Sequence, residues 1–219
     1  MIDLSNITSF LFDFDGVIAD TENGRYEAYQ EIFAHEGYDL SSRVSVQDLV
    51  GLTGDGFISK FFPEIPADKA KEMVHYRQTY YMNHLDRFCR PFPGMKNTIR
   101  EIKEKGYFLA LTTANTTRAA QSLIEQMEVA EYFDAICGRE ICVNPVTREK
   151  DYSIVPRHLN KMIAECVVVE DSPVGVAGAK RAGFRCIAFE HFKNPFISEM
   201  ADVIVHNYRE FRAVLGLMP

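Results

Sequence analysis

The chain has 219 residues, of which 47% are hydrophobic, and a formal net charge of -7 from 24 basic and 31 acidic residues. This length is sufficient for one sizeable hydrophobic core and a small second domain. The negative charge argues against nonspecific nucleic-acid binding and against binding to anionic membranes, because both depend on basic surfaces.

The start of the sequence lacks the basic and apolar regions of a secretion signal, and no apolar stretch approaches the length of a membrane span. The five cysteines form no Cys-x-x-Cys pair, and Cys166 and Cys186 lie within apolar runs, as reduced core thiols commonly do. We therefore expect a soluble, cytoplasmic protein. The sequence leaves its oligomeric state open.

An apolar run over residues 8–14 is followed by Asp15 and Gly16, a pattern typical of a buried parallel strand that ends in a polar loop. Further short apolar runs predict strands over residues 107–112, 135–137, 166–169, 185–189 and 202–205. Between them, residues 95–105 and 116–129 carry apolar side chains at helical spacing. This alternation predicts an α/β fold with a doubly wound, Rossmann-like parallel sheet, which binds ligands at the carboxyl ends of its strands.

Residues 21–88 break the alternation, because their apolar side chains recur only at helical spacing. We interpret this segment as a helical domain over residues 20–89, inserted into an α/β core formed by residues 1–19 and 90–219. Residues 54–56 (Gly-Asp-Gly) lack the Lys-Ser/Thr continuation of a nucleotide-binding loop, so we interpret them as a turn between two helices. The aromatic residues expected in the interior of the insertion are Tyr76, Tyr80 and Tyr81.

Chemically reactive side chains gather where the predicted strands end. They are Asp13 and Asp15 at the end of the first strand, Thr113, Ala114 and Asn115 after the strand over residues 107–112, Lys150 in a loop, and Glu170 and Asp171 after the strand over residues 166–169. In a parallel sheet these ends converge on one crevice, which would then hold carboxylates, a hydroxyl group and an amine.

Such a set suits phosphoryl transfer. Asp13 is the expected nucleophile and would form an aspartyl phosphate. Asp15 can protonate the leaving alcohol and later accept a proton from the water that hydrolyses the intermediate. Because carboxylates repel a phosphate dianion, we expect a divalent cation, Mg²⁺, to offset the charge. Its expected ligands are the carboxylates of Asp13, Glu170 and Asp171 and the main-chain carbonyl of Asp15.

The phosphoryl oxygens need donors that stabilise the charge of the transition state. We assign this role to the Thr113 hydroxyl, to the main-chain N–H groups of Ala114 and Asn115, and to the Lys150 ammonium. Arg148 is the alternative cation.

Purely structural roles remain open for some of these residues. An acidic residue before a proline is an ordinary helix cap, and Glu170 and Asp171 would then cap a helix that begins near Pro173. A separate structural alternative for Lys150 is a solvated loop lysine. The all-apolar strand that precedes Glu170 favours the metal site.

The motifs together resemble a known family. The strings DFDGVIADT, LTTAN and VVVEDSPVGVAGAKRAG, with Lys150, resemble the four ordered motifs of the haloacid dehalogenase superfamily. The helical insertion resembles the small cap domain of the β-phosphoglucomutase and phosphoglycolate phosphatase branch. The third motif departs from the Lys-Pro-x-Pro-Asp string common in that branch, because here Lys150 is followed by Asp-Tyr-Ser. The resemblance implies a nucleophile at Asp13, an acid/base at Asp15, phosphate contacts at Thr113 and Lys150, and metal ligands at Asp171 and Glu170.

We therefore predict a magnesium-dependent phosphatase that hydrolyses a small soluble phosphate monoester, either a sugar phosphate or a phosphorylated acid. The alternative is a phosphosugar mutase, which shares the core residues. In the β-phosphoglucomutases that the sequence resembles, a histidine and an arginine of the cap stand at the positions that hold Arg25 and Gly54 here. A glycine offers no side chain to a second phosphate, which favours the phosphatase. Arg25 is a candidate contact for an acidic or phosphorylated part of the substrate.

Two further functions are less compatible with the motifs. Dehalogenation needs neither a second aspartate nor a metal, so Asp15, Glu170 and Asp171 argue against it. A non-catalytic binding protein would not need the complete set of carboxylates.

Overall fold

A computed structural model of the chain describes residues 2–49, 54–144 and 150–217. The described chain divides into two compact units, a core unit and an insertion unit. The core unit comprises the residues up to Ala19 and from Pro91 onward, and the insertion unit spans Asp20–Arg90. The chain passes between the units at β2 (Ala19–Asp20) and β3 (Arg90–Pro91), which pair with each other in a two-stranded sheet.

The core unit contains a six-stranded parallel sheet with the order β5-β4-β1-β6-β7-β8. Its strands are β1 (Ser9–Asp13), β4 (Phe108–Thr112), β5 (Ala135–Cys137), β6 (Cys166–Glu170), β7 (Arg185–Phe189) and β8 (Val203–Val205). The order runs outward from β1 in both directions, which is the arrangement of a doubly wound sheet. The α/β fold class predicted from the sequence is therefore confirmed.

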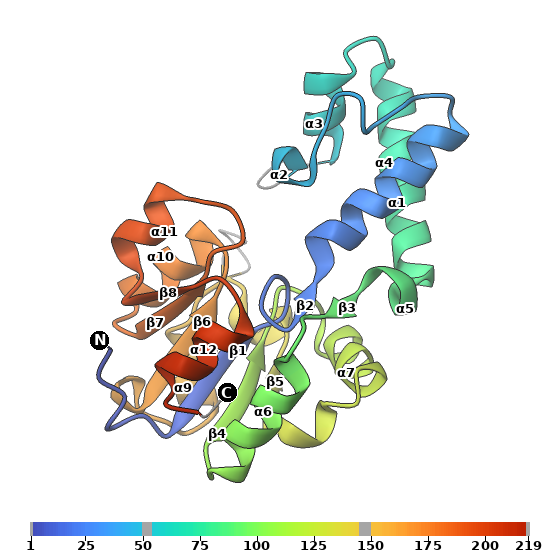
Figure 1. Cartoon of the computed structure of the whole chain (residues 1–219). Coiled ribbons are helices and arrows are strands. Elements are labelled where there is room, and N and C mark those ends of the chain that lie inside the picture. Colours follow the sequence, from blue (N-terminus) through green and yellow to red (C-terminus); the bar gives the residue numbers. More distant parts are fainter. Residues whose placement is uncertain (1, 50–53, 145–149, 218–219) are drawn as a thin grey trace. The chain divides into compact units, whose positions relative to one another are not determined.

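Helices cover both faces of this sheet because the side chains of each strand alternate between the faces. Phe12 lies 6.1 Å, between ring centroids, from Phe211 of α12 (Tyr208–Val214). Figure 1 shows α12 and α6 (Met95–Glu104) on the face turned towards the viewer. Leu11 belongs instead to a buried cluster with residues of α9 (Ile154–His158) and α10 (Pro173–Arg181). The central strand is therefore buried on both sides.

The other helices of the core unit connect the strands. They are α7 (Thr117–Gln126), α8 (Arg139–Cys142), α11 (Pro195–Met200) and the 3-10 turns η1 (Ala130–Tyr132) and η2 (Ile163–Glu165). All five cysteines are buried, and none of them forms a disulfide. Within the described residues, no helix combines the length and the apolar character that crossing a bilayer requires.

The insertion unit is helical, as its periodicity predicts. Its helices are α1 (Thr21–His35), α2 (Val46–Leu49), α3 (Gly54–Phe61), α4 (Ala67–Asn83) and α5 (Leu85–Phe88). They surround an aromatic core in which the Phe33 ring lies 5.9 Å from Phe57 and 4.7 Å from Phe62, between centroids. This unit therefore has a hydrophobic core of its own.

Two expectations for the insertion are wrong. Residues 54–56 do not form a turn, because they are the first residues of α3. Gly54 is required there by packing, since a Cβ atom would lie 2.5 Å from the Tyr29 hydroxyl. Tyr76 is not in the interior, because its side chain is 53% exposed. The buried face of α4 runs through Ala70 and Met73, and Tyr76 lies outside it.

Candidate active site

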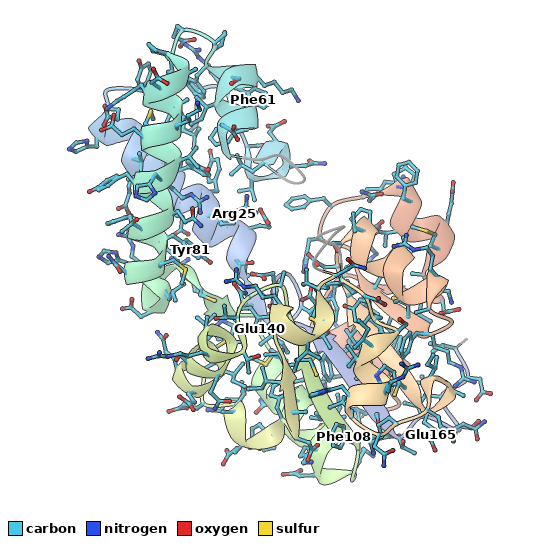
Figure 2. The ribbon with its side chains drawn as sticks, turned by 180° about the vertical axis from the view of Figure 1, so that it is seen from behind. Arg25, Phe61, Tyr81, Phe108, Glu140 and Glu165 are labelled. Carbon is cyan, nitrogen blue, oxygen red and sulfur yellow. The ribbon has the colours of Figure 1, made fainter. Side chains whose placement is uncertain are left out.

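The parallel register brings three sequence motifs together at the carboxyl edge of the sheet. Asp13, the last residue of β1, is paired with Thr112 of β4, and the preceding residue of β1 is paired with Val169 of β6. Thr113 and Glu170 therefore lie on either side of Asp13. Phe108 and Glu165, which are labelled in Figure 2, mark the amino ends of β4 and β6 at the opposite edge.

The Glu170 side chain accepts hydrogen bonds from five donors among the described residues of this edge. Its Oε1 accepts from Lys150 Nζ at 2.9 Å and from the Tyr152 hydroxyl at 2.8 Å. Its Oε2 accepts from the N–H groups of Asp171 (2.9 Å) and Ser172 (3.0 Å) and from the Ser172 hydroxyl (3.0 Å). A carboxylate has about four lone-pair sites, so five donors occupy it fully. The Glu170 side chain is completely buried, and these donors offset the cost of its burial.

Lys150 forms an ion pair with two carboxylates. Its Nζ lies 2.5 Å from Asp13 Oδ1 and 2.9 Å from Glu170 Oε1. Burial lowers the pKa of Lys150, but the charges of Asp13 and Glu170 outweigh burial and raise this pKa well above its usual value. Burial raises the pKa of Glu170, whereas the Lys150 ammonium lowers it and prevails. Both groups therefore stay charged at neutral pH.

Asp13 and Asp171 have an excess of negative charge around them. One oxygen from each of Asp13, Glu170 and Asp171 lies within 4.8 Å of the others. Burial, followed by the charge of Glu170, raises the pKa values of Asp13 and Asp171 well above the usual range. A divalent cation would relieve this repulsion, and carboxylate oxygens are the hard ligands that Mg²⁺ prefers. The residues present therefore fit a magnesium ion.

The loop after β1 allows Asp171 to approach closely. Gly16 has a φ of +72°, and a Cβ atom at this position would lie 1.8 Å from Asp171 Oδ2. The Gly16 carbonyl oxygen lies 2.6 Å from His191 Nε2. Because a carbonyl oxygen can only accept, His191 Nε2 is the donor. The His191 ring in turn stacks on Phe92, with 4.8 Å between the centroids. A glycine is therefore required where the loop meets the carboxylate.

Asp15 is oriented by the motif that follows β4. Asn115 Nδ2 donates to Asp15 Oδ2 and to the Thr113 hydroxyl, both at 3.2 Å. The Asn115 N–H also donates to the Thr113 hydroxyl at 3.1 Å. Thr113 is completely buried, whereas Ala114 is exposed. The Asn115 amide therefore links the Asp15 carboxylate to a fixed hydroxyl group.

The structure brings together most of the residues that the sequence analysis selects. Asp13, Asp15, Thr113, Asn115, Lys150, Glu170 and Asp171 all belong to this network. Arg25, labelled in Figure 2, is in the insertion unit. Its guanidinium forms an ion pair with Glu22 at 2.6 Å. Arg148 lies outside the described residues. The helix after Asp171 is capped by the Ser172 hydroxyl, so Glu170 and Asp171 are not its cap.

Sequence reasoning missed Tyr152 and the contact between Asn115 and Asp15. Tyr152 stands two residues after Lys150 and is 1% exposed. The sequence carried one signal for Tyr152: it follows Lys150 in the motif where the related branch has the string Lys-Pro-x-Pro-Asp.

A doubly wound sheet with buried carboxylates and a lysine at its carboxyl edge defines an α/β enzyme with an acidic centre. Comparison with known proteins identifies the family. The model for haloacid dehalogenase-like hydrolases matches residues 10–189, and the chain belongs to this family.

Two phosphatases match this chain over most of their length. A protein of Thermotoga maritima named phosphorylated carbohydrates phosphatase is 29% identical over 182 residues, which cover 81% of this chain and 82% of the relative. The phosphoglycolate phosphatase of Caulobacter vibrioides is 23% identical over 210 residues, with 93% and 88% covered. A haloacid dehalogenase-like hydrolase from Streptococcus pneumoniae has a similar fold, with a TM-score of 0.75, 21% identity, and 96% and 99% of the chains covered.

Proposed function

We propose that the protein is a magnesium-dependent phosphatase that hydrolyses a small soluble phosphate monoester through an aspartyl phosphate on Asp13. The proposal depends on one observation: at the edge of the sheet, the Asp13 carboxylate contacts the Lys150 ammonium and lies within 4.8 Å of the Glu170 and Asp171 carboxylates. The names of the two phosphatase relatives support a sugar phosphate or a phosphorylated acid as the substrate.

In this proposal Asp13 is the nucleophile. Its hydrogen bonds with the Phe14 N–H (2.6 Å) and the Lys150 ammonium both involve Oδ1, so we assign the attack to Oδ2. This oxygen forms a bond to phosphorus while the ester P–O bond breaks, and Asp15 gives a proton to the departing alcohol. Asp15 then accepts a proton from water. The water oxygen attacks phosphorus, the bond to Asp13 breaks, and inorganic phosphate leaves.

The other residues hold the charges in place. Mg²⁺ bound by the carboxylates of Asp13 and Asp171 and the carbonyl of Asp15 would offset the charge of the phosphoryl group. Because Glu170 is already saturated by five donors, we assign it to holding Lys150 and the loop that carries Asp171. The phosphoryl oxygens are assigned to the Lys150 ammonium, the Thr113 hydroxyl and the N–H groups of Ala114 and Asn115.

The insertion unit supports hydrolysis over mutase activity. A mutase must bind a second phosphate group, and Gly54 occupies the position where a cap arginine would do so. A Cβ atom at Gly54 would lie 2.9 Å from the Val74 methyl groups and 2.5 Å from the Tyr29 hydroxyl, so this position has no room for a side chain. Arg25 forms an ion pair with Glu22 through one guanidinium nitrogen, Nη1. We propose that its remaining N–H groups contact an acidic part of the substrate.

Turnover assays test this function. We expect phosphate release from p-nitrophenyl phosphate and from members of a panel of phosphorylated sugars and acids. EDTA should abolish the release and Mg²⁺ should restore it, and full activity in metal-free buffer would overturn the magnesium assignment. Incubation with β-glucose 1-phosphate and a bisphosphate activator should release phosphate. Catalytic formation of glucose 6-phosphate without matching phosphate release would identify a mutase instead.

A further inference from the structure

We propose that Tyr152 is a positioning residue that, through Glu170, holds the Lys150 ammonium over Asp13. The kinetic part of this inference rests on the proposed phosphatase function. The position of the ammonium is inferred from the contacts of the buried side chains and does not depend on that function.

The Tyr152 side chain has a fixed place. It is 1% exposed and belongs to the apolar cluster between the sheet and α9 and α10. Its ring contacts Phe184 at a centroid distance of 6.3 Å. The hydroxyl group is the polar end of this buried side chain, and it donates to Glu170 Oε1 at 2.8 Å. The ring is therefore held by packing and the hydroxyl by one carboxylate oxygen.

Lys150 and Tyr152 donate to the same oxygen. Lys150 Nζ is 2.9 Å from Glu170 Oε1. The other oxygen, Oε2, is held by Ser172 and by the Asp171 N–H, so the carboxylate cannot rotate. The main chain between the two donors is also fixed, because the Asp151 N–H donates to the Cys142 carbonyl at 2.7 Å.

The shared oxygen determines where the ammonium lies. A lysine side chain has four rotatable bonds, so its charge is placed by its partners and not by its own stiffness. Lys150 divides its hydrogen bonds between Asp13 and Glu170. The Tyr152 hydroxyl occupies part of the accepting capacity of Oε1 and so keeps the ammonium from moving fully onto Glu170. Without this hydroxyl, we expect Lys150 to bind Glu170 more tightly and to move away from Asp13 and from an incoming phosphoryl group.

The test is Tyr152→Phe, which keeps the packed ring and removes the hydroxyl. Loss of a hydrogen bond to a charged group should lower kcat about tenfold, with KM changed less than about twofold. In a Lys150→Met background, the same substitution should leave kcat unchanged, because its effect passes through the ammonium. The matched control is Tyr80→Phe, which removes a 2.5 Å hydrogen bond from a tyrosine to Glu31 in the insertion unit and should leave kcat unchanged.

A second measurement does not need turnover. The ¹H–¹⁵N signal of the Lys150 ammonium, assigned by its loss in Lys150→Met, should shift or broaden in Tyr152→Phe and stay in place in Tyr80→Phe. An unchanged ammonium signal in Tyr152→Phe would overturn the inference, as would an equal loss of kcat in the presence and absence of Lys150. A wild-type protein without phosphatase activity would contradict the proposed function only, and the ammonium signal would still decide the role of Tyr152.

Discussion

Asp13 and Asp15 are two positions apart but have different surroundings. Asp13 is buried and contacts Lys150, whereas Asp15 is partly exposed and accepts from the Asn115 amide. Equal residue types in unequal environments can perform different steps of one reaction, because the environment determines which carboxylate keeps its charge. The two residues should therefore respond differently to the same substitution.

Asp13→Asn should lose all measurable turnover and remain folded, since the amide keeps the shape and removes the nucleophile. Asp15→Asn should lower kcat by about 10² to 10⁴, the range for a displaced acid/base. Steady-state assays and circular dichroism measure the two effects. The control is Asp134→Asn, which affects a carboxylate paired with Lys103 at 2.6 Å and should leave kcat unchanged. Wild-type turnover by Asp13→Asn would rule out the covalent mechanism.

A comparison of alanine variants at Gly16 and Gly106 distinguishes the effect of backbone strain from the effect of crowding against Asp171. Both have positive φ angles, +72° and +86°, but only at Gly16 would a Cβ atom meet another group, Asp171 Oδ2 at 1.8 Å. Alanine at either position should destabilise the fold by about 1–2 kcal/mol because of its left-handed backbone.

Gly16→Ala should also weaken Mg²⁺ binding, because Asp171 must move. Isothermal titration with Mg²⁺ and urea unfolding of both variants measure the two effects. Equal Mg²⁺ affinity in Gly16→Ala and Gly106→Ala would mean that the Gly16–Asp171 contact has no part in metal binding.

At the scale of elements, the junction between β6 and α10 combines a helix cap with the support of the site. The Ser172 hydroxyl accepts from the Gly175 N–H and donates to Glu170, both at 3.0 Å. A Cβ atom at Gly175 would lie 2.0 Å from Glu170 Oε1, so the first turn of the helix packs directly on the carboxylate. The start of α10 therefore fixes Glu170 as well as itself.

Ser172→Ala should cost about 1 kcal/mol of unfolding free energy through loss of the cap, and should also lower kcat. Asn207 caps α12 by accepting from the Glu210 N–H at 3.0 Å, far along the chain from these motifs. Asn207→Ala should cost a similar free energy and leave kcat unchanged. Urea denaturation and steady-state kinetics compare the pair. If both variants kept full kcat, the support of Glu170 by Ser172 would have no catalytic importance.

For the whole molecule, the buried carboxylates link stability to pH and to metal. The pKa values of Asp13 and Asp171 are raised in the folded, metal-free protein, chiefly by burial and then by the charge of Glu170. The folded state then binds more protons than the unfolded state, so this contribution to stability is present below the unfolded pKa values and is lost as pH rises through the folded ones. Mg²⁺ binding offsets the loss because it favours the charged carboxylates.

The increase in Tm caused by Mg²⁺ should therefore grow as pH rises from acidic to neutral values, and Mg²⁺ binding should release protons. At a hundredfold excess over Kd, one bound ion stabilises a protein by about 2.7 kcal/mol. Thermal unfolding at several pH values, with and without EDTA, measures the effect. Asp171→Asn should abolish it. A Tm increase that is independent of pH would show that Mg²⁺ binding is not linked to the protonation of Asp13 and Asp171.

Local sequence patterns determined the class of fold and the region of the site. Apolar runs such as residues 166–169 predict buried parallel strands, and the six strands of the sheet confirm them. Because parallel strands end at one edge, the polar residues after them could be selected without knowledge of any contact. The same local reasoning failed for Gly54, where glycine suggested a turn although close packing against Tyr29 is what requires it.

Only the tertiary structure decided which side chains pair. Glu170 and Lys150 are 20 residues apart, and Asp15 and Asn115 are 100 residues apart. Periodicity shows which face of an element is buried, but not which donor will reach a given buried acceptor. The pairing of donors and acceptors depends on how strands and helices pack. Burial restricts this pairing further, because each buried charge must be paired or neutralised. This is why the sequence selected Glu170 as a metal ligand, whereas its five contacts in the folded chain favour a supporting role.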